Sequence, residues 1–461
     1  MMPEQLAIDH TIDEVNQERG YISSGQNKLQ FCMSNLTSNM QNIEASQRMP
    51  SSPPGFHYGW VIIIVGTLVV FGSLGLARFS YTVMLPAMQE SLTMDNMQAG
   101  VLATANLVGY LALSVIGGAL AAQYGPRVVI SIALALAGVG MLLTGMANSF
   151  LSAAVWRAVV GIGSGASNVP VLGLLSAWFA PRRRGFASGI VVAGSSMALI
   201  FLGPFVPRVL SAYGESGWRM CWFIFGGVTL LLAVGGFIFL RNHPAEKGLK
   251  PFGADTEDTV PSPGPQAIEW RLVYQSPAVW HVGLVYAAFG FSYIIYMTFF
   301  AKRLMAEGGY SQQAAGGLFM TMGWFSLVCG LIWGTVSDVI GRKGALIIVY
   351  LIHTVSFTMF ALWPTPVGFT ISAILFGLSA WSIPAIMAAV CGDVLGPRLA
   401  PAGMGFITLF FGIGQAVGPS VAGGMADAAG SFTSPLLLAG GAALLGAFGS
   451  LFLNQAALLK S

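Results

Sequence analysis

Charged residues are scarce in this sequence. Only 8% of its 461 residues are Asp, Glu, Lys or Arg, against roughly 25% in a typical soluble protein, and the mean hydropathy is +0.72. This composition excludes a soluble enzyme. The net charge of +3 comes from basic residues scattered between apolar runs rather than gathered in a patch, so we expect no nucleic-acid partner.

The residues that usually carry catalysis or bind metals are also few. The four cysteines show no metal-site spacing and read as small apolar residues. The long apolar runs contain no Asp or Glu, and His281 and His353 are the only histidines in or near them. A membrane enzyme should cluster such residues, and no nucleotide-binding loop is found either. The sequence therefore predicts no enzyme, no catalytic residues, no metal, no cofactor and no ATP.

Long apolar runs fill most of the chain. A membrane helix needs about 20 apolar residues, and twelve runs approach or exceed that length: 59–83, 99–122, 128–147, 151–176, 186–209, 219–240, 278–300, 314–336, 344–363, 367–391, 402–425 and 434–455. We expect residues 1–57 to form a disordered cytoplasmic tail and 58–240 a six-helix bundle. Residues 241–276 read as a cytoplasmic linker, and 277–461 as a second six-helix bundle with a short cytoplasmic tail. The predicted fold is an all-α integral membrane protein.

The two halves of the sequence repeat the same landmarks in the same direction. Gly203-Pro204 and Gly418-Pro419 lie 215 residues apart, and Val169-Pro170 and Ile383-Pro384 lie 214 apart. Parallel repeats of this kind are typical of transporters, whose site lies between the halves near mid-membrane. The two Gly-Pro pairs should kink their helices at equivalent points, and we predict a role in gating for all four residues.

Lysine and arginine predict the orientation. With the N-terminus inside, twelve basic residues fall in cytoplasmic loops and the C-terminal tail. At most four fall on the other side: Lys302 and Arg303 in a loop, with Arg208 and Arg219 at the rims of spans. We expect a multi-pass protein of the cell membrane, surrounded by the lipid bilayer, with both termini cytoplasmic.

Several motifs resemble those of the major facilitator superfamily. The loop from Gly334 to Lys343 resembles the motif that this family carries between spans 2 and 3 and again between spans 8 and 9. The first copy is degraded, since Ala122 replaces the aspartate and Pro126 stands where the second copy has Arg342. Residues 151–165, with Arg157, resemble the family's span 4 motif. The resemblance covers about residues 58–455 and implies alternating access. We expect Asp338 and Arg342 to form a breakable cytoplasmic latch.

A narrower resemblance concerns the substrate. Residues 78–81, Trp218-Arg219 and residues 240–248 resemble the monocarboxylate and oxalate–formate antiporter branch. That branch often uses charged residues in spans 8 and 11 for its anions. Spans 8 and 11 of this sequence contain none, which argues against oxalate or formate.

Two arginines, Arg78 and Arg157, lie inside predicted spans without an acidic partner there. A charge in the membrane costs about 2.5–3.5 kcal/mol on insertion scales, so each arginine needs a compensating interaction. Each could bind an anion. Alternatively, Arg78 snorkels near the outer interface, and Arg157 braces neighbouring helices.

Further candidates for substrate contact are aromatic or amide side chains. In span 7, Tyr286, Tyr293 and Tyr296 share one helix face, which could be a substrate wall or a packing face. The others are polar residues in apolar runs, for which interhelical hydrogen bonds are an equal explanation: Tyr81, Asn106, Tyr110, Asn168 and Gln415.

The sequence thus predicts a monomeric secondary active or facilitative transporter that works by alternating access. Its expected substrate is a small organic anion such as a monocarboxylate. Two alternatives stay open: an efflux carrier for other small hydrophobic molecules, and a transport-dead membrane sensor on the same fold. Because no acid lies inside a span, we expect anion exchange, facilitated diffusion, or symport in which the substrate itself brings the proton.

Overall fold

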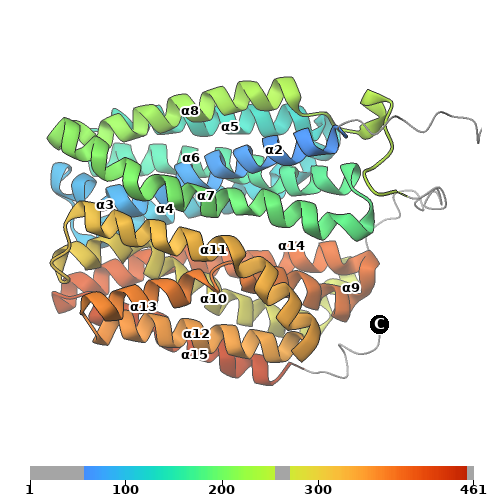
Figure 1. The fold of residues 1–461 in the computed structure, drawn as a ribbon. Helices are drawn as coiled ribbons and strands as arrows, with labels where there is room; N and C mark the ends of the chain where they lie inside the picture. The colour runs from blue at the N-terminus through green and yellow to red at the C-terminus, as the bar shows by residue number, and fades with distance from the viewer. Residues whose placement is uncertain (1–56, 255–269, 454–461) are drawn as a thin grey trace, which may run out of the picture. The chain divides into compact units, whose positions relative to one another are not determined.

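The computed structural model describes residues 57–254 and 270–453, and within these ranges almost every residue is helical. The predicted tail therefore lies outside the described residues, except for His57. In the described chain, the one backbone bridge between extended segments joins Phe179 and Phe252. The predicted all-α class is confirmed (Figure 1).

The first half begins with three consecutive helical elements that form one continuous rod. They are α2 (Gly59–Val70), the π-helix η1 (Phe71–Phe79) and α3 (Ser80–Ser91). The remaining long helices of this half are α4 (Asn96–Tyr124), α5 (Pro126–Gly145), α6 (Phe150–Trp178), α7 (Pro181–Tyr213) and α8 (Gly217–Phe239). A short 3₁₀ turn, η2 (Gly214–Ser216), separates α7 from α8, and another, η3 (Pro244–Lys247), follows α8.

The second half has the short helix α9 (Trp270–Tyr274) and then six longer ones. These are α10 (Pro277–Ala306), α11 (Gln312–Ile340), α12 (Arg342–Leu362), α13 (Pro366–Gly377), α14 (Ser382–Ala429) and α15 (Thr433–Leu451). The 48-residue α14 holds the end of one predicted span and the whole of the next.

The number of membrane crossings agrees with the sequence. In the described residues, ten helical segments are long and apolar enough to cross a membrane, and α11, bent by 42°, makes an eleventh. One of the ten, Arg183–Phe239, has 57 residues and contains nearly all of α7 and the whole of α8. Since about 20 residues suffice for one crossing, counting these two helices separately gives the predicted twelve.

The first membrane-spanning helical rod is longer than predicted, and this changes the position of Arg78 relative to its end. The apolar run in the sequence ends at residue 83, but the rod continues to Ser91 with Pro86 inside it. Met84, Leu85 and Met88 are fully buried beyond the expected end, so packing holds this stretch helical. Arg78 therefore lies 13 residues before the end of this continuous helical rod rather than close to its end.

Two antiparallel helix pairs join the halves: α4 with α14, and α7 with α11. A Cβ added at Gly100 would lie 2.1 Å from the carbonyl oxygen of Pro419, and one at Gly203 would lie 2.4 Å from that of Gly316. Only glycine permits such approaches. Next to the Gly100–Pro419 contact, Asp427 accepts hydrogen bonds from the backbone amides of Asn96 (3.1 Å) and Met97 (2.7 Å). We call this the Asn96 end of the bundle.

Toward the other end of the bundle, the helices of these two pairs no longer pack closely on each other. That end carries Arg127, Arg241 and Arg342, and we call it the basic end. Continuing the antiparallel register would place Gly118 opposite Gly405 and Gly189 opposite Gly334. In the part of the chain that the structure describes, a Cβ added at any of these four glycines would meet no atom within 4 Å. The halves thus touch at the Asn96 end and separate toward the basic end.

The first part of the predicted linker packs on the first half. The backbone amide of Phe252 donates to the carbonyl of Trp178 (2.8 Å), and the Trp178 indole donates to the carbonyl of Arg241 (2.8 Å). The Asn242 side chain accepts from the amide of Arg127 at the start of α5 (2.9 Å). Residues 255–269 of this linker lie outside the described residues.

Candidate functional site

The polar centre of the described structure is built around Arg78 on the π-helix η1. Its Nη2 donates to the hydroxyl of Tyr293 on α10 at 2.7 Å. The same hydroxyl accepts from Nε2 of Gln415 on α14 at 2.5 Å. Arg78 belongs to the first half, and Tyr293 and Gln415 belong to the second, so the Arg78–Tyr293 contact spans the two halves.

Aromatic rings surround the Arg78 guanidinium. Its Cζ lies 5.8 Å from the ring centroids of Phe79 and Tyr110 and 6.0 Å from that of Tyr293. The amide of Asn168 on α6 donates to the Tyr110 hydroxyl at 2.9 Å. Thus five sequence candidates, on η1, α4, α6, α10 and α14, come together around one cationic group. Such rings stabilise a cation without neutralising it.

Trp381 belongs to the same centre, although the sequence patterns did not single it out. Its ring packs against Phe79 (5.5 Å) and Tyr293 (6.4 Å), and its indole N–H donates to Ser196 of α7 at 3.1 Å. The residue lies at the break between α13 and α14. A proline deprives the carbonyl four residues earlier of its helical partner, so Pro384 was a signal in the sequence for a break at this point.

A small cavity adjoins Arg78. Its polar lining consists of Arg78, Tyr81, Thr82, Asn106, Arg157 and Thr298. No carboxylate lines it, and neither arginine has an acidic partner among the described residues. The Nε atoms of both arginines are buried without a hydrogen-bond partner there. The cavity therefore carries uncompensated positive charge.

Arg157 on α6 is more enclosed than Arg78. It is 1% exposed, and its Cζ lies 4.9 Å from the Tyr81 ring and 5.0 Å from the Trp222 ring. Its Nη1 donates to the carbonyl oxygen of Ala77 at 2.6 Å. Asn106 on α4 donates to its backbone carbonyl at 3.1 Å. These contacts hold the side chain against the helices of the first half.

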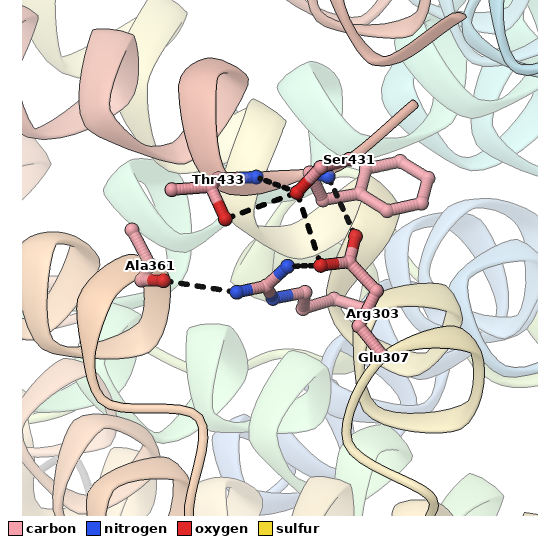
Figure 2. Close-up of polar contacts among 6 residues, drawn as sticks. Arg303, Glu307, Ala361, Ser431 and Thr433 are labelled. Carbon is pink, nitrogen blue, oxygen red and sulfur yellow. Dashed lines mark hydrogen bonds and ion pairs between the residues drawn. The ribbon is translucent and has the colours of Figure 1, made fainter. Parts of the chain in front are cut away.

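A third buried arginine, Arg303, does have a carboxylate. It lies in the last turns of α10, is 2% exposed, forms an ion pair with Glu307 and donates to the carbonyl of Ala361 at 2.9 Å (Figure 2). Glu307 in turn accepts from the Phe432 amide at 2.6 Å. The expectation that Lys302 and Arg303 lie in a loop is wrong, because α10 continues to Ala306.

The three candidate tyrosines on one face of α10 lie in different surroundings. Tyr293 reaches Arg78, and Tyr286 stacks on Phe411 with ring centroids 4.5 Å apart. Tyr296 is fully buried among Phe300, Phe357, Phe360 and Phe376, and its hydroxyl lies 3.0 Å from that of Ser372. Its packing within the second half keeps Tyr296 out of the cavity, so we do not retain it as a substrate contact.

The predicted latch residues lie within the second half. Arg342 Nη1 donates to Asp338 Oδ1 at 2.5 Å, and its Nε lies 3.5 Å from Asp393 Oδ2. This network ties α11, α12 and α14 together at the basic end.

The Gly-Pro pairs lie nearer the Asn96 end. Gly203 and Pro419 contact the opposite half, as described above, whereas Gly418 packs on Phe291 of its own half. Pro204 lies inside α7, next to the crossing at Gly203.

The comparisons with a family model and with known proteins all find transporters. The family model described as "Uncharacterised MFS-type transporter YbfB" matches residues 70–451. The chain is 27% identical over 406 residues to a probable sulfoacetate transporter of Cupriavidus necator, covering 82% of this chain and 90% of that protein. It is 24% identical to the hexuronate transporter of Bacillus subtilis, with coverages of 80% and 88%. It is 25% identical to monocarboxylate transporter 11 of Homo sapiens, with coverages of 87% and 83%.

Solved structures agree on the fold. A bacterial homologue of the human lysosomal transporter Spinster, solved in an inward-facing and unoccupied conformation, gives a TM-score of 0.66 at 18% identity, covering 89% of this chain and 97% of that one. The nucleoside transporter NupG gives a TM-score of 0.67 at 12% identity, with coverages of 85% and 99%. At these identities the likeness concerns the fold alone.

Proposed function

This chain belongs to the major facilitator family described as "Uncharacterised MFS-type transporter YbfB", and we propose that it carries a small organic anion across the cell membrane by alternating access. It is a multi-span membrane transporter. The substrate we propose is a monocarboxylate or a closely related organic acid. The relatives named above are named for sulfoacetate, hexuronate and monocarboxylates, which are all organic anions.

The observation that carries this proposal is Arg78. It is a permanently charged group in the middle of a crossing, at the contact between the halves, and no carboxylate neutralises it in the described structure. A buried charge persists where something compensates it. A carboxylate would do so with two parallel hydrogen bonds to the guanidinium, and the unpartnered Nε is one donor for such a pair.

The arrangement of the halves suits alternating access. The excess of lysine and arginine assigns the basic end to the cytoplasm. The halves touch at the Asn96 end and separate toward the basic end, and this arrangement supports a state open to the cytoplasm. Arg78 and Tyr293 would then be reached from the cytoplasm and would bind the anion between the halves.

The test is uptake of radiolabelled organic acids into proteoliposomes. We expect Arg78→Gln to abolish uptake, and Arg78→Lys to retain part of it, since lysine keeps the charge but loses the planar fork. Arg208→Gln is the matched control, because Arg208 is an exposed arginine in the membrane helix α7. It should transport like the unmodified protein. Uptake by Arg78→Gln at the unmodified rate would refute the proposal.

A further inference from the structure

The segment that carries Arg78 is a π-helix, which is rare and is often found at functional sites. At its end, the backbone amide of Ser80 bonds to the carbonyl of Gly75, five residues back. In an α-helix it would bond to Leu76, four residues back. The widened turn therefore changes which backbone groups are paired just before and after Arg78.

Two side chains bond to carbonyls at this transition. The Leu76 carbonyl accepts the Ser80 hydroxyl at 2.5 Å, and the Ala77 carbonyl accepts Nη1 of Arg157 at 2.6 Å. Buried carbonyls need partners, and each of these two carbonyls accepts one of these side-chain bonds. Ala77 directly precedes Arg78, so Arg157 holds the backbone at the point from which the Arg78 side chain leaves.

Arg157 lines the cavity together with Arg78, and its Nε is also unpartnered, but it is the more enclosed of the two. Its guanidinium lies between the Tyr81 and Trp222 rings and is 1% exposed. The helix that carries Arg157, α6, is also held in place. A Cβ added at Gly161 would lie 1.9 Å from the carbonyl oxygen of Asn106, so α6 packs directly on the backbone of α4. A planar, stacked guanidinium with a fixed hydrogen bond is a rigid support.

We propose that Arg157 is a positioning residue that holds the π-helical turn at Ala77 and so presents Arg78 to the substrate. Arg78 alone then supplies the charge that binds the anion. Successive residues of an α-helix are turned by about 100°. Loss of the π-turn would rotate Arg78 relative to α2 and move it away from Tyr293. The inference rests on the proposed function only in taking Arg78 as the anion-binding group.

The first experiment compares Arg157→Met with Ser80→Ala in proteoliposome uptake. Ser80 is uncharged, fully buried and outside the cavity lining, yet it bonds to the neighbouring carbonyl of the same turn. If the turn positions Arg78, both variants raise KM several-fold and leave Vmax and the thermal unfolding midpoint nearly unchanged.

Arg219→Met is the matched control. Arg219 also stacks on a tryptophan, Trp218 (4.3 Å), and also donates to a backbone carbonyl, that of Ala147 (2.6 Å), but it does not contact the π-turn. It should leave KM unchanged. A KM that does not rise in Ser80→Ala, or an Arg157→Met variant that only unfolds more easily, would overturn the proposal.

A double-mutant cycle separates positioning from direct binding. If Arg157 acts through Arg78, Arg157→Met should add little to the KM of Arg78→Lys, because the effects of a supporting residue and its target are not additive. Full additivity would mean that Arg157 binds the anion itself.

A last measurement needs no transport. Phenylglyoxal modifies arginine, and mass spectrometry of the peptide that contains Arg78 gives its rate of modification in detergent-solubilised protein. That rate should change in Arg157→Met and Ser80→Ala but not in Arg219→Met. If the unmodified protein takes up no organic anion, the proposed function fails, while this rate still decides the role of Arg157. An unchanged rate in both variants would refute that role.

Discussion

Arg78, Arg157 and Arg303 are the same side chain in three chemical situations. Arg303 has a carboxylate beside it, Arg157 is stacked between two rings and bonded to a carbonyl, and Arg78 faces a tyrosine of the other half. The cost of burying a charge is met in a different way at each position. At Arg78, which contacts the opposite half, we propose that a bound anion takes that role.

The Arg303–Glu307 pair makes a prediction about a single residue. Glu307→Gln keeps the shape of the side chain but leaves Arg303 without a countercharge. Breaking a buried pair costs roughly 3–5 kcal/mol, and we expect about 2–3 kcal/mol here because Glu307 is 26% exposed. The measurement is unfolding of the purified protein in denaturing detergent. Glu215→Gln, at an exposed carboxylate in η2, is the control. Equal stability of the two variants would mean that the pair does not stabilise the second half.

Among the helices, two pairs set how the halves meet. Close crossings at Gly100–Pro419 and Gly203–Gly316 pack backbone against backbone near the Asn96 end. Bonds between α4 and α14 reinforce the first crossing, with Thr104 donating to the Ala416 carbonyl at 2.7 Å. The contacts are between helices rather than within one, so the pairs can separate without breaking any helix.

Adding a methyl group at a crossing should shift the balance between conformations. A Cβ at Gly100 overlaps the Pro419 carbonyl oxygen, so Gly100→Ala should favour the state in which the Asn96 end is open. Labelling of a cysteine introduced at Ser420 by a membrane-impermeant thiol reagent should rise several-fold. Gly118→Ala, at a glycine of the same helix with no atom within 4 Å of an added Cβ, should label like the parent protein. Equal labelling of both variants would show that this crossing does not close the Asn96 end.

Across the protein as a whole, the distribution of acids limits how transport can be driven. The buried polar and charged residues of the described structure include arginines and a histidine but no Asp or Glu. Asp338 and Asp393 lie at the basic end, both beside Arg342. The described residues therefore offer no buried carboxylate that could carry a proton in mid-membrane. Exchange of anions needs no such group.

We therefore expect preloading of proteoliposomes with the transported anion to accelerate uptake. Asp338→Asn and Asp393→Asn should change the rate, because each loosens the Arg342 network, but should leave the pH dependence of uptake intact. Uptake is measured under an imposed pH gradient, with and without preloading. If one of these variants uncouples accumulation from the gradient while exchange persists, a carboxylate at the end of a span carries the proton and the expectation is wrong.

The class of this protein and much of its plan follow from the order of its residues. The length of an apolar run is a local property, so twelve crossings can be counted along the chain without knowing how the helices pack. The repeated glycine and proline landmarks indicate the duplication, and the scarcity of charge makes Arg78 and Arg157 conspicuous. Arg78, Tyr110, Asn168, Tyr293 and Gln415 are all predicted from the sequence as substrate contacts, and the fold brings them together.

What each of these residues does depends instead on how the helices pack. Whether a helical side chain meets lipid, a neighbouring helix or the cavity is decided by contacts between segments far apart in the chain. For this reason Tyr293 and Tyr296, three residues apart on one face, have different surroundings, and Trp381 joins the site through a break in its helix. The π-turn that aims Arg78 likewise depends on Arg157, 79 residues later in the chain. Periodicity along the sequence describes a single helix and holds no information about its neighbours.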